Sequence, residues 1–387
     1  MHKTMTTLPA GRDVARARLA VSLAFVVMGV TLGAWSPQVA VIKQRLDLSD
    51  AQLGFYLLIL PLAACFGMAL ATALSTRIGT GPLMRLFAPL TPLALLPPVF
   101  APDPLSTILA FFGFGFTFGA LDIAMNAHAS LVERHIGRPV MGRFHAWFSA
   151  GAFAGAAMAS PLTAYAGPTG QAVITVLLTI PVACLAGVWA FAGAQDRGID
   201  GAPLIALPGP RIIIFGLIAL MVLAGEGASL DWSAVWSVSA LALPQSQAAW
   251  PFAAFSLGMF IGRYHGDHLR ARMSGATILL GGALLWSAGL AVALASRPLW
   301  LVIAGFGVFG LGVSMLFPVL IAMAAERTQR NETAAIAAVV SMGYLGVLLG
   351  PPIVGFIAQA SSLTTALGLV AALGLVVAFA GYRSARR

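Results

Sequence analysis

The sequence is short of charge. Only 9% of its 387 residues are Asp, Glu, Lys or Arg, whereas a soluble domain carries about 25%. Such a chain lacks the charge needed to cover a globular surface, and 59% of it is hydrophobic. We therefore expect an integral membrane protein. Because the apolar runs are long and continuous, they favour an all-α membrane fold over a barrel of short alternating strands.

Cysteine is nearly absent, since the chain has only Cys65 and Cys184, each within an apolar run. No Cys-x-x-Cys pair or Cys/His cluster occurs, so the sequence supports neither a metal site nor a disulfide framework. A phosphate-binding Gly-x-x-x-x-Gly-Lys-Ser/Thr loop is also missing, which argues against ATP as the energy source. No Ser/His/Asp set has a supporting context. We expect no metal, no cofactor and no enzymatic activity.

Apolar runs of about 20 residues, the length that crosses a bilayer, recur along the whole chain. We predict twelve spans, the eighth of them short, at residues 19–42, 51–74, 82–101, 106–130, 141–165, 169–192, 212–236, 248–264, 273–296, 299–324, 333–358 and 362–382. The longest connector is rich in Gly, Pro and Asp, as linkers are. It predicts an N-terminal six-helix bundle at 1–192, a cytoplasmic linker at 193–210 and a C-terminal six-helix bundle at 211–387.

The net charge of +9 would suggest a nucleic-acid partner in a soluble chain. Here the basic residues lie in short connectors beside apolar spans, where they determine topology. With the N-terminus inside, only Lys43, Arg45 and Arg297 of the 22 Lys and Arg residues fall outside. This bias predicts a multi-pass protein of the bacterial inner membrane with both termini in the cytoplasm. We expect no nucleic-acid partner.

The two predicted bundles resemble each other in sequence. Gly113-Phe-Gly115 recurs as Gly305-Phe-Gly307, and Ser149-x-Gly151 recurs as Ser341-x-Gly343, both with an offset of 192 residues. The shared offset aligns span 4 with span 10 and span 5 with span 11. Two bundles of the same orientation joined by a cytoplasmic linker are typical of transporters built from parallel repeats.

An ionisable residue stands inside the fourth span. Asp122 shares one helical stripe with Gly115, Gly119 and Asn126, a pattern suited to facing a cavity or packing closely on a neighbour. A lone charge at the centre of a membrane helix costs about 2.5–3.5 kcal/mol on insertion scales. A buried carboxylate can take up and release a proton as access alternates, so Asp122 is a candidate proton-coupling residue. The alternative is a structural hydrogen bond to a neighbouring helix.

The fifth span adds polar residues at a similar depth. From the helical rise, Asn126 and His145 both lie about 12 Å to the cytoplasmic side of the span centres. Ser149 shares a stripe with His145. We predict that Asp122, Asn126, His145 and Ser149 form one polar cluster. His145, Asn126 and Ser149 are candidate substrate-binding residues, although such residues also serve as interhelical contacts.

The seventh span carries a second acid, Glu226, between two glycines that weaken the helix, as in carriers that line a site with a broken helix. It is a candidate proton-coupling residue. Ser229 and Ser233 lie on the same face. Trp232 is a candidate substrate contact, and Asp231 is expected to mark the interface or a loop.

The first span has no acidic residue, and its larger side chains with polar groups are those of Trp35 and Gln38. Both are candidates for the substrate cavity, because an indole ring can stack on a sugar-like or aromatic solute. Most tryptophans in membrane proteins nevertheless belong to packing or to the interface belt.

Two loops carry a charge motif. The loop between spans 2 and 3 contains Arg77 and Gly79, and the loop between spans 8 and 9 contains Arg263, Gly266 and Asp267. On these loops and on its twelve-span layout the chain resembles the major facilitator superfamily over essentially its whole length. Arg77, Arg263 and Asp267 are then predicted to form a cytoplasmic gate.

Longer stretches carry a finer resemblance. LDIAMNAHASLVE and GRPVMGRFHAWFSAGAFAGA within 121–156, and EGASLDWSAVW at 226–236, are similar to the bacterial YbjJ-like branch, loosely related to fucose permease. Fucose permease-like carriers use an acid on span 4, which the resemblance places at Asp122, and another on span 1, which is missing here. The Gly-Pro signature of antiporters on span 5 is also missing, while Gly350-Pro351 stands on span 11.

The resemblance implies a monomeric secondary active transporter that moves a small polar, possibly sugar-like, organic solute by alternating access, with protons as the coupling ion. Efflux of a drug-like compound by proton antiport is the alternative within this class. A membrane-embedded enzyme would need a denser cluster of acid, base or metal-binding residues. A non-transporting sensor would need an appended soluble domain, for which the connectors are too short.

Overall fold

A computed structural model describes residues 11–191, 212–327 and 332–386 of the chain. The described residues form helices and short connectors, without a strand among them. The helices are α1 (Gly11–Arg45), α2 (Asp50–Ile78), α3 (Thr80–Leu93), α4 (Leu96–Phe100), α5 (Pro104–Ile136), α6 (Met141–Trp189), α7 (Ile213–Ser239), η2 (Gln245–Gln247), α8 (Trp250–Tyr264), α9 (Gly266–Arg272), α10 (Gly275–Ala295), α11 (Leu299–Val313), α12 (Leu316–Glu326), α13 (Glu332–Ala360) and α14 (Leu363–Arg386).

The helices account for the predicted spans. Within the described residues, ten helical segments are long and apolar enough to cross a membrane. Helix α6 contains two spans, joined at Gly167, whose φ of 71° lies in the left-handed region that glycine adopts without strain. The short eighth span is α8, with 15 residues. The all-α membrane fold expected from the sequence is therefore confirmed.

Two predicted spans are each divided into two helices. The third span is split into α3 and α4, where prolines at 89, 92, 97 and 98 remove backbone donors over ten residues. The tenth span is split into α11 and α12, with a break at Ser314 and Met315. These breaks bend the spans without adding a crossing.

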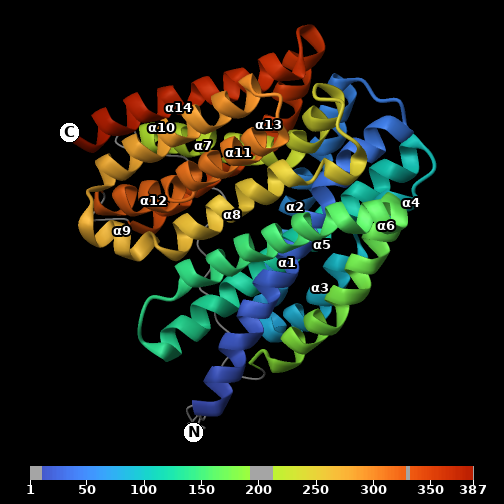
Figure 1. Cartoon of the computed structure of the whole chain (residues 1–387). Helices are drawn as coiled ribbons and strands as arrows, with labels where there is room; N and C mark the ends of the chain where they lie inside the picture. Colours follow the sequence, from blue (N-terminus) through green and yellow to red (C-terminus); the bar gives the residue numbers. More distant parts are fainter. Residues whose placement is uncertain (1–10, 192–211, 328–331, 387) are drawn as a thin grey trace, which may run out of the picture.

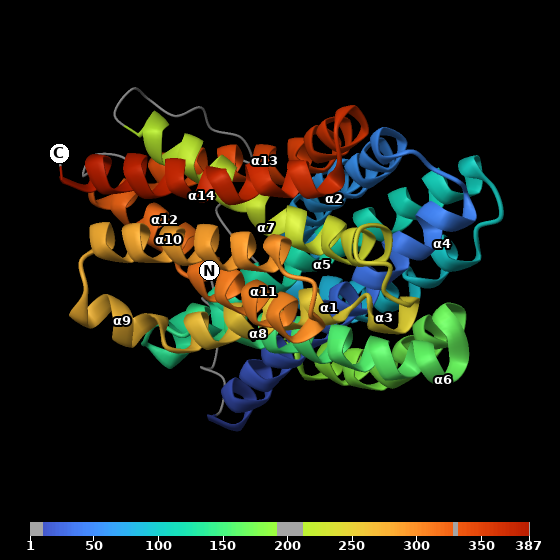
Figure 2. The same ribbon diagram turned by 45° about the horizontal axis from the view of Figure 1, so that its top comes forward.

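Equivalent helices pair in the two halves of the chain. Helix α1 packs on α6 and α2 on α5, while α7 packs on α13 and α8 on α11. These equivalent contacts agree with the sequence repeat, which aligns span 4 with span 10 and span 5 with span 11. Figures 1 and 2 show the first half, α1 to α6, beside the second half, α7 to α14. The halves contact each other through α2 against α13 and α6 against α8.

The predicted domain boundaries remain a prediction. The linker at 193–210 lies outside the described residues.

We call the end of the assembly that carries both ends of the described chain the terminal face, and the opposite end the distal face.

Glycines allow the paired helices to approach closely. A Cβ at Gly115 of α5 would overlap the carbonyl oxygen of Leu60 in α2, and a Cβ at Gly119 would overlap that of Ala64. The small stripe leading to Asp122 thus packs on a neighbouring helix, the second of the two alternatives that the sequence left open. Two residues before Gly115, a Cβ at Gly113 would meet nothing within 4 Å.

This difference gives a matched pair of variants. Gly115→Ala is expected to destabilise the protein by about 1–3 kcal/mol, because the added carbon must push two backbones apart. Gly113→Ala, in the same helix, should be neutral or stabilising, because alanine favours a helix over glycine. Thermal unfolding in detergent measures both. Equal melting temperatures for the two variants would contradict the close packing of α2 and α5.

Helix α5 begins at a side-chain cap. Asp103 accepts hydrogen bonds from the backbone N–H groups of Leu105 and Ser106, both at 3.0 Å, and from the Ser106 hydroxyl at 2.8 Å. These bonds, with those from Ser106 the strongest, hold the pKa of the exposed Asp103 carboxyl below its ordinary value. The cap thereby fixes where the helix that carries Asp122 starts.

Asp103→Ala is therefore expected to lower the melting temperature modestly at neutral pH. Because the folded-state pKa is lowered, the contribution of the carboxylate is present above its ordinary pKa and is lost as the pH falls through the lowered value. The difference between Asp103→Ala and the parent should shrink on acidification. Asp103→Asn keeps a capping oxygen and should melt closer to the parent. A difference that is constant from pH 7 to pH 3 would argue against the charged cap.

Candidate functional site

Asp122 lies in a hydrogen-bonded group that joins the two halves. Its Oδ1 accepts a hydrogen bond from Asn126 Nδ2 at 2.9 Å, within α5. Its Oδ2 accepts one from the hydroxyl of Tyr344 in α13 at 3.2 Å. Asp122 and Asn126 are half-buried and Tyr344 is 37% exposed, so the carboxylate is not sealed within the packed helices. The sequence reasoning missed Tyr344, because its partner lies more than 200 residues away.

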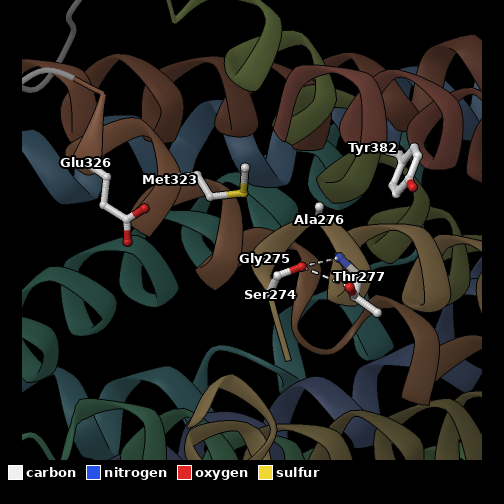
Figure 3. Close-up of a pocket in the computed structure, with 7 residues that line it drawn as sticks. All are labelled: Ser274, Gly275, Ala276, Thr277, Met323, Glu326 and Tyr382. Carbon is white, nitrogen blue, oxygen red and sulfur yellow. Dashed lines mark hydrogen bonds between the residues drawn. The ribbon is translucent and has the colours of Figure 1, made fainter. Parts of the chain in front are cut away.

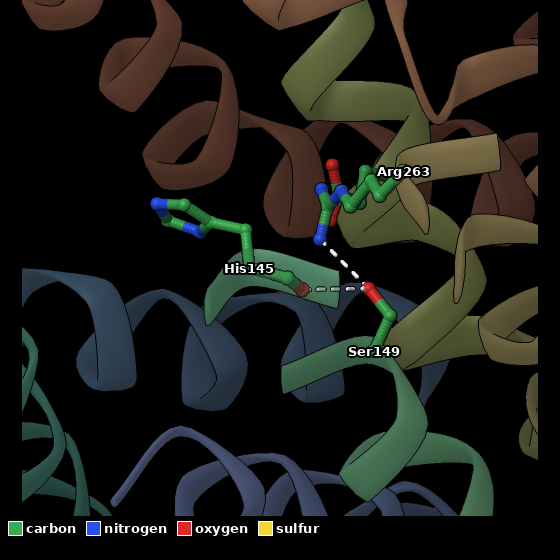
Figure 4. A network of polar contacts seen from close by, with 4 residues as sticks. His145, Ser149 and Arg263 are labelled. Atoms are coloured by element: carbon green, nitrogen blue, oxygen red, sulfur yellow. Dashed lines mark hydrogen bonds and ion pairs between the residues drawn. The ribbon is translucent and has the colours of Figure 1, made fainter. Parts of the chain in front are cut away.

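A second polar group surrounds Arg263, near the end of α8. Its Nη1 donates to Ser149 Oγ of α6 at 2.9 Å, and its Nη2 lies 3.4 Å from Glu226 Oε1 of α7. The side chains of Arg263 and Glu226 are 15% and 27% exposed. Figure 4 shows Ser149 between the arginine and the backbone carbonyl of His145, to which its hydroxyl donates at 3.3 Å. This group also crosses between the halves, from α6 to α7 and α8.

The structure corrects the predicted grouping of these residues. The expected single cluster of Asp122, Asn126, His145 and Ser149 is instead two groups, with Asp122 and Asn126 turned to α13. The ring of His145 packs edge-on against the ring of Phe25, with 5.2 Å between the ring centroids. The physical reason is that the second half offers a separate partner to each helix, Tyr344 to α5 and Arg263 to α6, which sequence spacing within the first half does not reveal.

The predicted gate is also different. Arg263 pairs with Glu226 rather than with Asp267, because its guanidinium lies within reach of both Ser149 and Glu226. Arg77 and Asp267 are exposed, and no ion pair joins either of them to another of the described residues. A gating role for these two stays a prediction.

The polar residues of α1 lie inside the first half. Gln38 Nε2 donates to the carbonyl of Pro168 at 2.8 Å and to Gln171 Oε1, so it holds the bend between the two spans of α6. Trp35 packs against the rings of Phe111 and Phe114. Both residues are 1% exposed. In this arrangement both side chains belong to the packed interior of the first half. For Trp35 this is the packing alternative named in the sequence analysis.

The distal half of α7 is buried and holds unpaired polar atoms. Trp232 is fully buried, and its Nε1 has no hydrogen-bond partner, like the hydroxyls of Ser229 and Ser233. Asp231 is 7% exposed within the helix, so the alternative that it lies in a loop is wrong. A regular helix continues through Gly225 and Gly227, which carries Asp231 into the packed interior.

The halves also meet at the distal face. Ser36 of α1 donates to the carbonyl of Leu230 in α7 at 2.8 Å, and Gln245 Nε2 donates to Gln44 Oε1 at 2.8 Å. A Cβ at Gly54 of α2 would lie 2.8 Å from the carbonyl oxygen of Pro351 in α13. These contacts close the distal face in this arrangement.

A cavity of about 360 Å³ opens at the terminal face of the second half. Figure 3 shows it between the start of α10, with Ser274 and Thr277, the end of α12, with Glu326, and Tyr382 of α14. None of the predicted site residues lines it. In residues 11–191, 212–327 and 332–386, no group of three or more His, Cys, Asp or Glu is placed to hold a metal ion.

Two helical halves are linked by side-chain hydrogen bonds between α5 and α13 and between α6 and α8, an arrangement typical of membrane carriers built from two repeats. The second half, residues 212–387, matches the family model "Major Facilitator Superfamily". An uncharacterised MFS-type transporter of Yersinia pestis is 34% identical over 357 residues, which are 92% of each chain. The membrane protein MosC of Rhizobium meliloti is 29% identical over 93% of this chain and 88% of its own. The chain belongs to the Major Facilitator Superfamily.

Solved structures share the fold at low sequence identity. The nucleoside transporter NupG superposes with a TM-score of 0.77 at 13% identity, covering 95% of this chain and 98% of its own. A D-xylose-proton symporter gives 0.73 at 12% identity, covering 96% and 97%. The protein is thus a multi-pass membrane transporter of the major facilitator fold.

Proposed function

We propose that the protein is a monomeric, proton-coupled secondary transporter of a small polar organic solute, sugar-like or nucleoside-like. We place it in the bacterial inner membrane, with the terminal face in the cytoplasm, and in the YbjJ-like branch related to fucose permease. The proposed bundles are residues 1–192 and 211–387, joined by the linker at 193–210.

The observation that carries the coupling proposal is the hydrogen bond from Tyr344 to Asp122. It joins an ionisable group of the first half to the second half, so rocking of the halves must break it. A charged carboxylate accepts this bond more strongly than a protonated one. The protonation of Asp122 and the relative position of the halves are therefore linked, and such a link is what a proton-driven carrier requires.

The substrate class rests on the chemistry near these groups. Asn126, Tyr344 and Ser149 offer an amide and hydroxyls, which suit a neutral, hydroxyl-bearing solute. The charges of Arg263 and Glu226 compensate each other, which leaves neither as an unpaired partner for a charged solute. Structural neighbours that are a nucleoside transporter and a D-xylose-proton symporter support the same class by analogy of fold alone.

The test is uptake into liposomes that contain the purified protein. A panel of labelled monosaccharides and nucleosides is presented with the outside one pH unit more acidic than the inside, with and without a protonophore. We expect at least one solute to accumulate, by up to about tenfold for a one-to-one symport, and to lose its accumulation with the protonophore. Accumulation of drug-like cations under the reverse gradient, without uptake of any panel member, would overturn the proposal in favour of efflux.

A further inference from the structure

Asp231 is an acid that the proposed mechanism leaves unused. It lies five residues after Glu226 in α7, about 7.5 Å farther toward the distal face. It is 7% exposed, and no hydrogen bond or ion pair joins its side chain to another described residue. An ionised carboxylate that is buried without partners is strongly unfavourable, so this arrangement favours the protonated acid.

The neighbouring helices offer no charge at its level. Helices α10 and α11 contain no ionisable residue. The ionisable residues near the terminal face on the other helices packed around α7 are Arg12, Asp13, Arg16 and Arg18 of α1, Arg263 and Tyr264 of α8, Glu326 of α12, Glu332 of α13, and Tyr382 and Arg383 of α14.

The remaining ionisable groups are each engaged elsewhere. Tyr344 of α13 is bonded to Asp122 and lies eleven residues, about 16 Å, before Gly355, the residue of α13 that contacts Trp232. At the distal end, Lys43 pairs with Asp50 of α2 at 3.2 Å. Arg45 donates to the carbonyls of Pro98 and Val99. None of these provides a counter-ion for Asp231.

Asp231 also stands where the distal face closes. The residue before it, Leu230, accepts the hydrogen bond from Ser36 of the first half. The residue after it, Trp232, lies against Gly355, and a Cβ at Gly355 would be 3.2 Å from both the Trp232 ring and Gly54 of α2. Opening of the distal face would separate α1 and α2 from α7 and α13, and it would admit water to the helix at Asp231.

We propose that Asp231 is a proton-binding site that must be occupied for the distal face to close. When the distal face opens, water solvates the carboxylate and the proton can leave. When it closes, the buried side chain takes a proton up. The inference rests on the proposed rocking of the halves, but it does not need Asp122 to be the coupling residue.

The sign of the pH effect follows from proton uptake on closure. Low pH favours the closed distal face and high pH the open one. There is a pH range in which the closed arrangement holds the proton and the open arrangement has released it. Within that range, the ratio of the closed to the open population should fall about tenfold per pH unit, as for one bound proton.

Spin labels at the distal ends of α2 and α13 measure this ratio. Cysteines are placed at Ala51 and Ala360, and the two native exposed cysteines, Cys65 and Cys184, are replaced by alanine. Distance distributions are recorded by pulsed electron spin resonance from pH 5 to pH 9. In the parent we expect a short-distance population that decreases as the pH rises.

Asp231→Asn should keep the short-distance population at every pH, and Asp231→Glu should keep the pH response. Asp231→Ser also removes the carboxyl but leaves a smaller side chain. It should show the same pH-independent short-distance population as Asp231→Asn, and it replaces that variant if Asp231→Asn does not fold. Asp122→Asn should retain the response at the distal face, which separates this proposal from the function of Asp122. A parent without a pH response, or an Asp231→Asn protein that responds like the parent, would overturn the inference.

Discussion

Asp122→Asn is expected to abolish proton-driven accumulation while leaving substrate exchange intact. The amide is nearly the shape of the carboxyl. Its oxygen can accept from Asn126 at the Oδ1 position, and its NH2 group can donate to the Tyr344 hydroxyl oxygen at the other, so a link between α5 and α13 is kept. What is lost is the ability to bind and release a proton. A gradient of one pH unit supports about tenfold accumulation, or 1.4 kcal/mol, and the variant should bring this ratio to about one.

Counterflow separates the two functions of the site. In liposomes preloaded with unlabelled substrate, Asp122→Asn should exchange labelled substrate at a rate comparable to the parent, because exchange needs no net proton movement. Asp13→Asn, which removes an exposed carboxylate at the start of α1, is the matched control and should accumulate substrate normally. If Asp122→Asn still accumulates substrate under the pH gradient, Asp122 is not the coupling site and the hydrogen bond to Tyr344 is structural.

Arg263→Ala is expected to impair both stability and transport. It leaves the carboxylate of Glu226, whose side chain is 27% exposed, without its cation and removes the donor to Ser149 of the other half. Loss of a hydrogen bond to a charged group destabilises by about 1.5–3 kcal/mol when the partner stays behind. An effect of this size on the contact between the halves changes the ratio of their arrangements by about tenfold or more.

A double-mutant cycle isolates the ion pair. Arg263→Ala combined with Glu226→Gln should melt at a higher temperature than Arg263→Ala alone, because no unpaired carboxylate remains. Arg272→Ala, which removes an exposed arginine of α9, is the control and should change neither melting nor uptake. Additive effects of the two substitutions would show that Arg263 and Glu226 act independently.

Much of the fold could be predicted because the bilayer restricts the choices. Apolar runs of the length of a membrane must be helices, since backbone groups in lipid have no other partner. The sequence therefore predicted the spans, including the short eighth one, and the pairing of the halves from the repeats at Gly113 and Gly305. The division of the third span was not predicted, although the prolines at 89, 92, 97 and 98 mark it. The division of the tenth span carries no proline at its break and depends on how the helices pack.

The candidate site was predicted only in part. Asp122 and Glu226 stood out because charge is rare in these spans, and Asn126 followed from helical spacing. Tyr344, the partner of Asp122, lies in the other half of the chain, and Arg263 lies 37 residues from Glu226 in another helix. No local pattern indicates which residues meet across such distances. Asp231 was misjudged because a sequence does not reveal whether a residue near the end of a span is solvated or packed.

The sequence by itself determined that the protein is a helical membrane protein built of two similar halves, because hydropathy, charge placement and helical period are local properties. Only the tertiary structure decided which ionisable groups are paired, since that depends on contacts between helices distant in the chain. It joined Asp122 to Tyr344 and Arg263 to Glu226, and it left Asp231 buried without a partner.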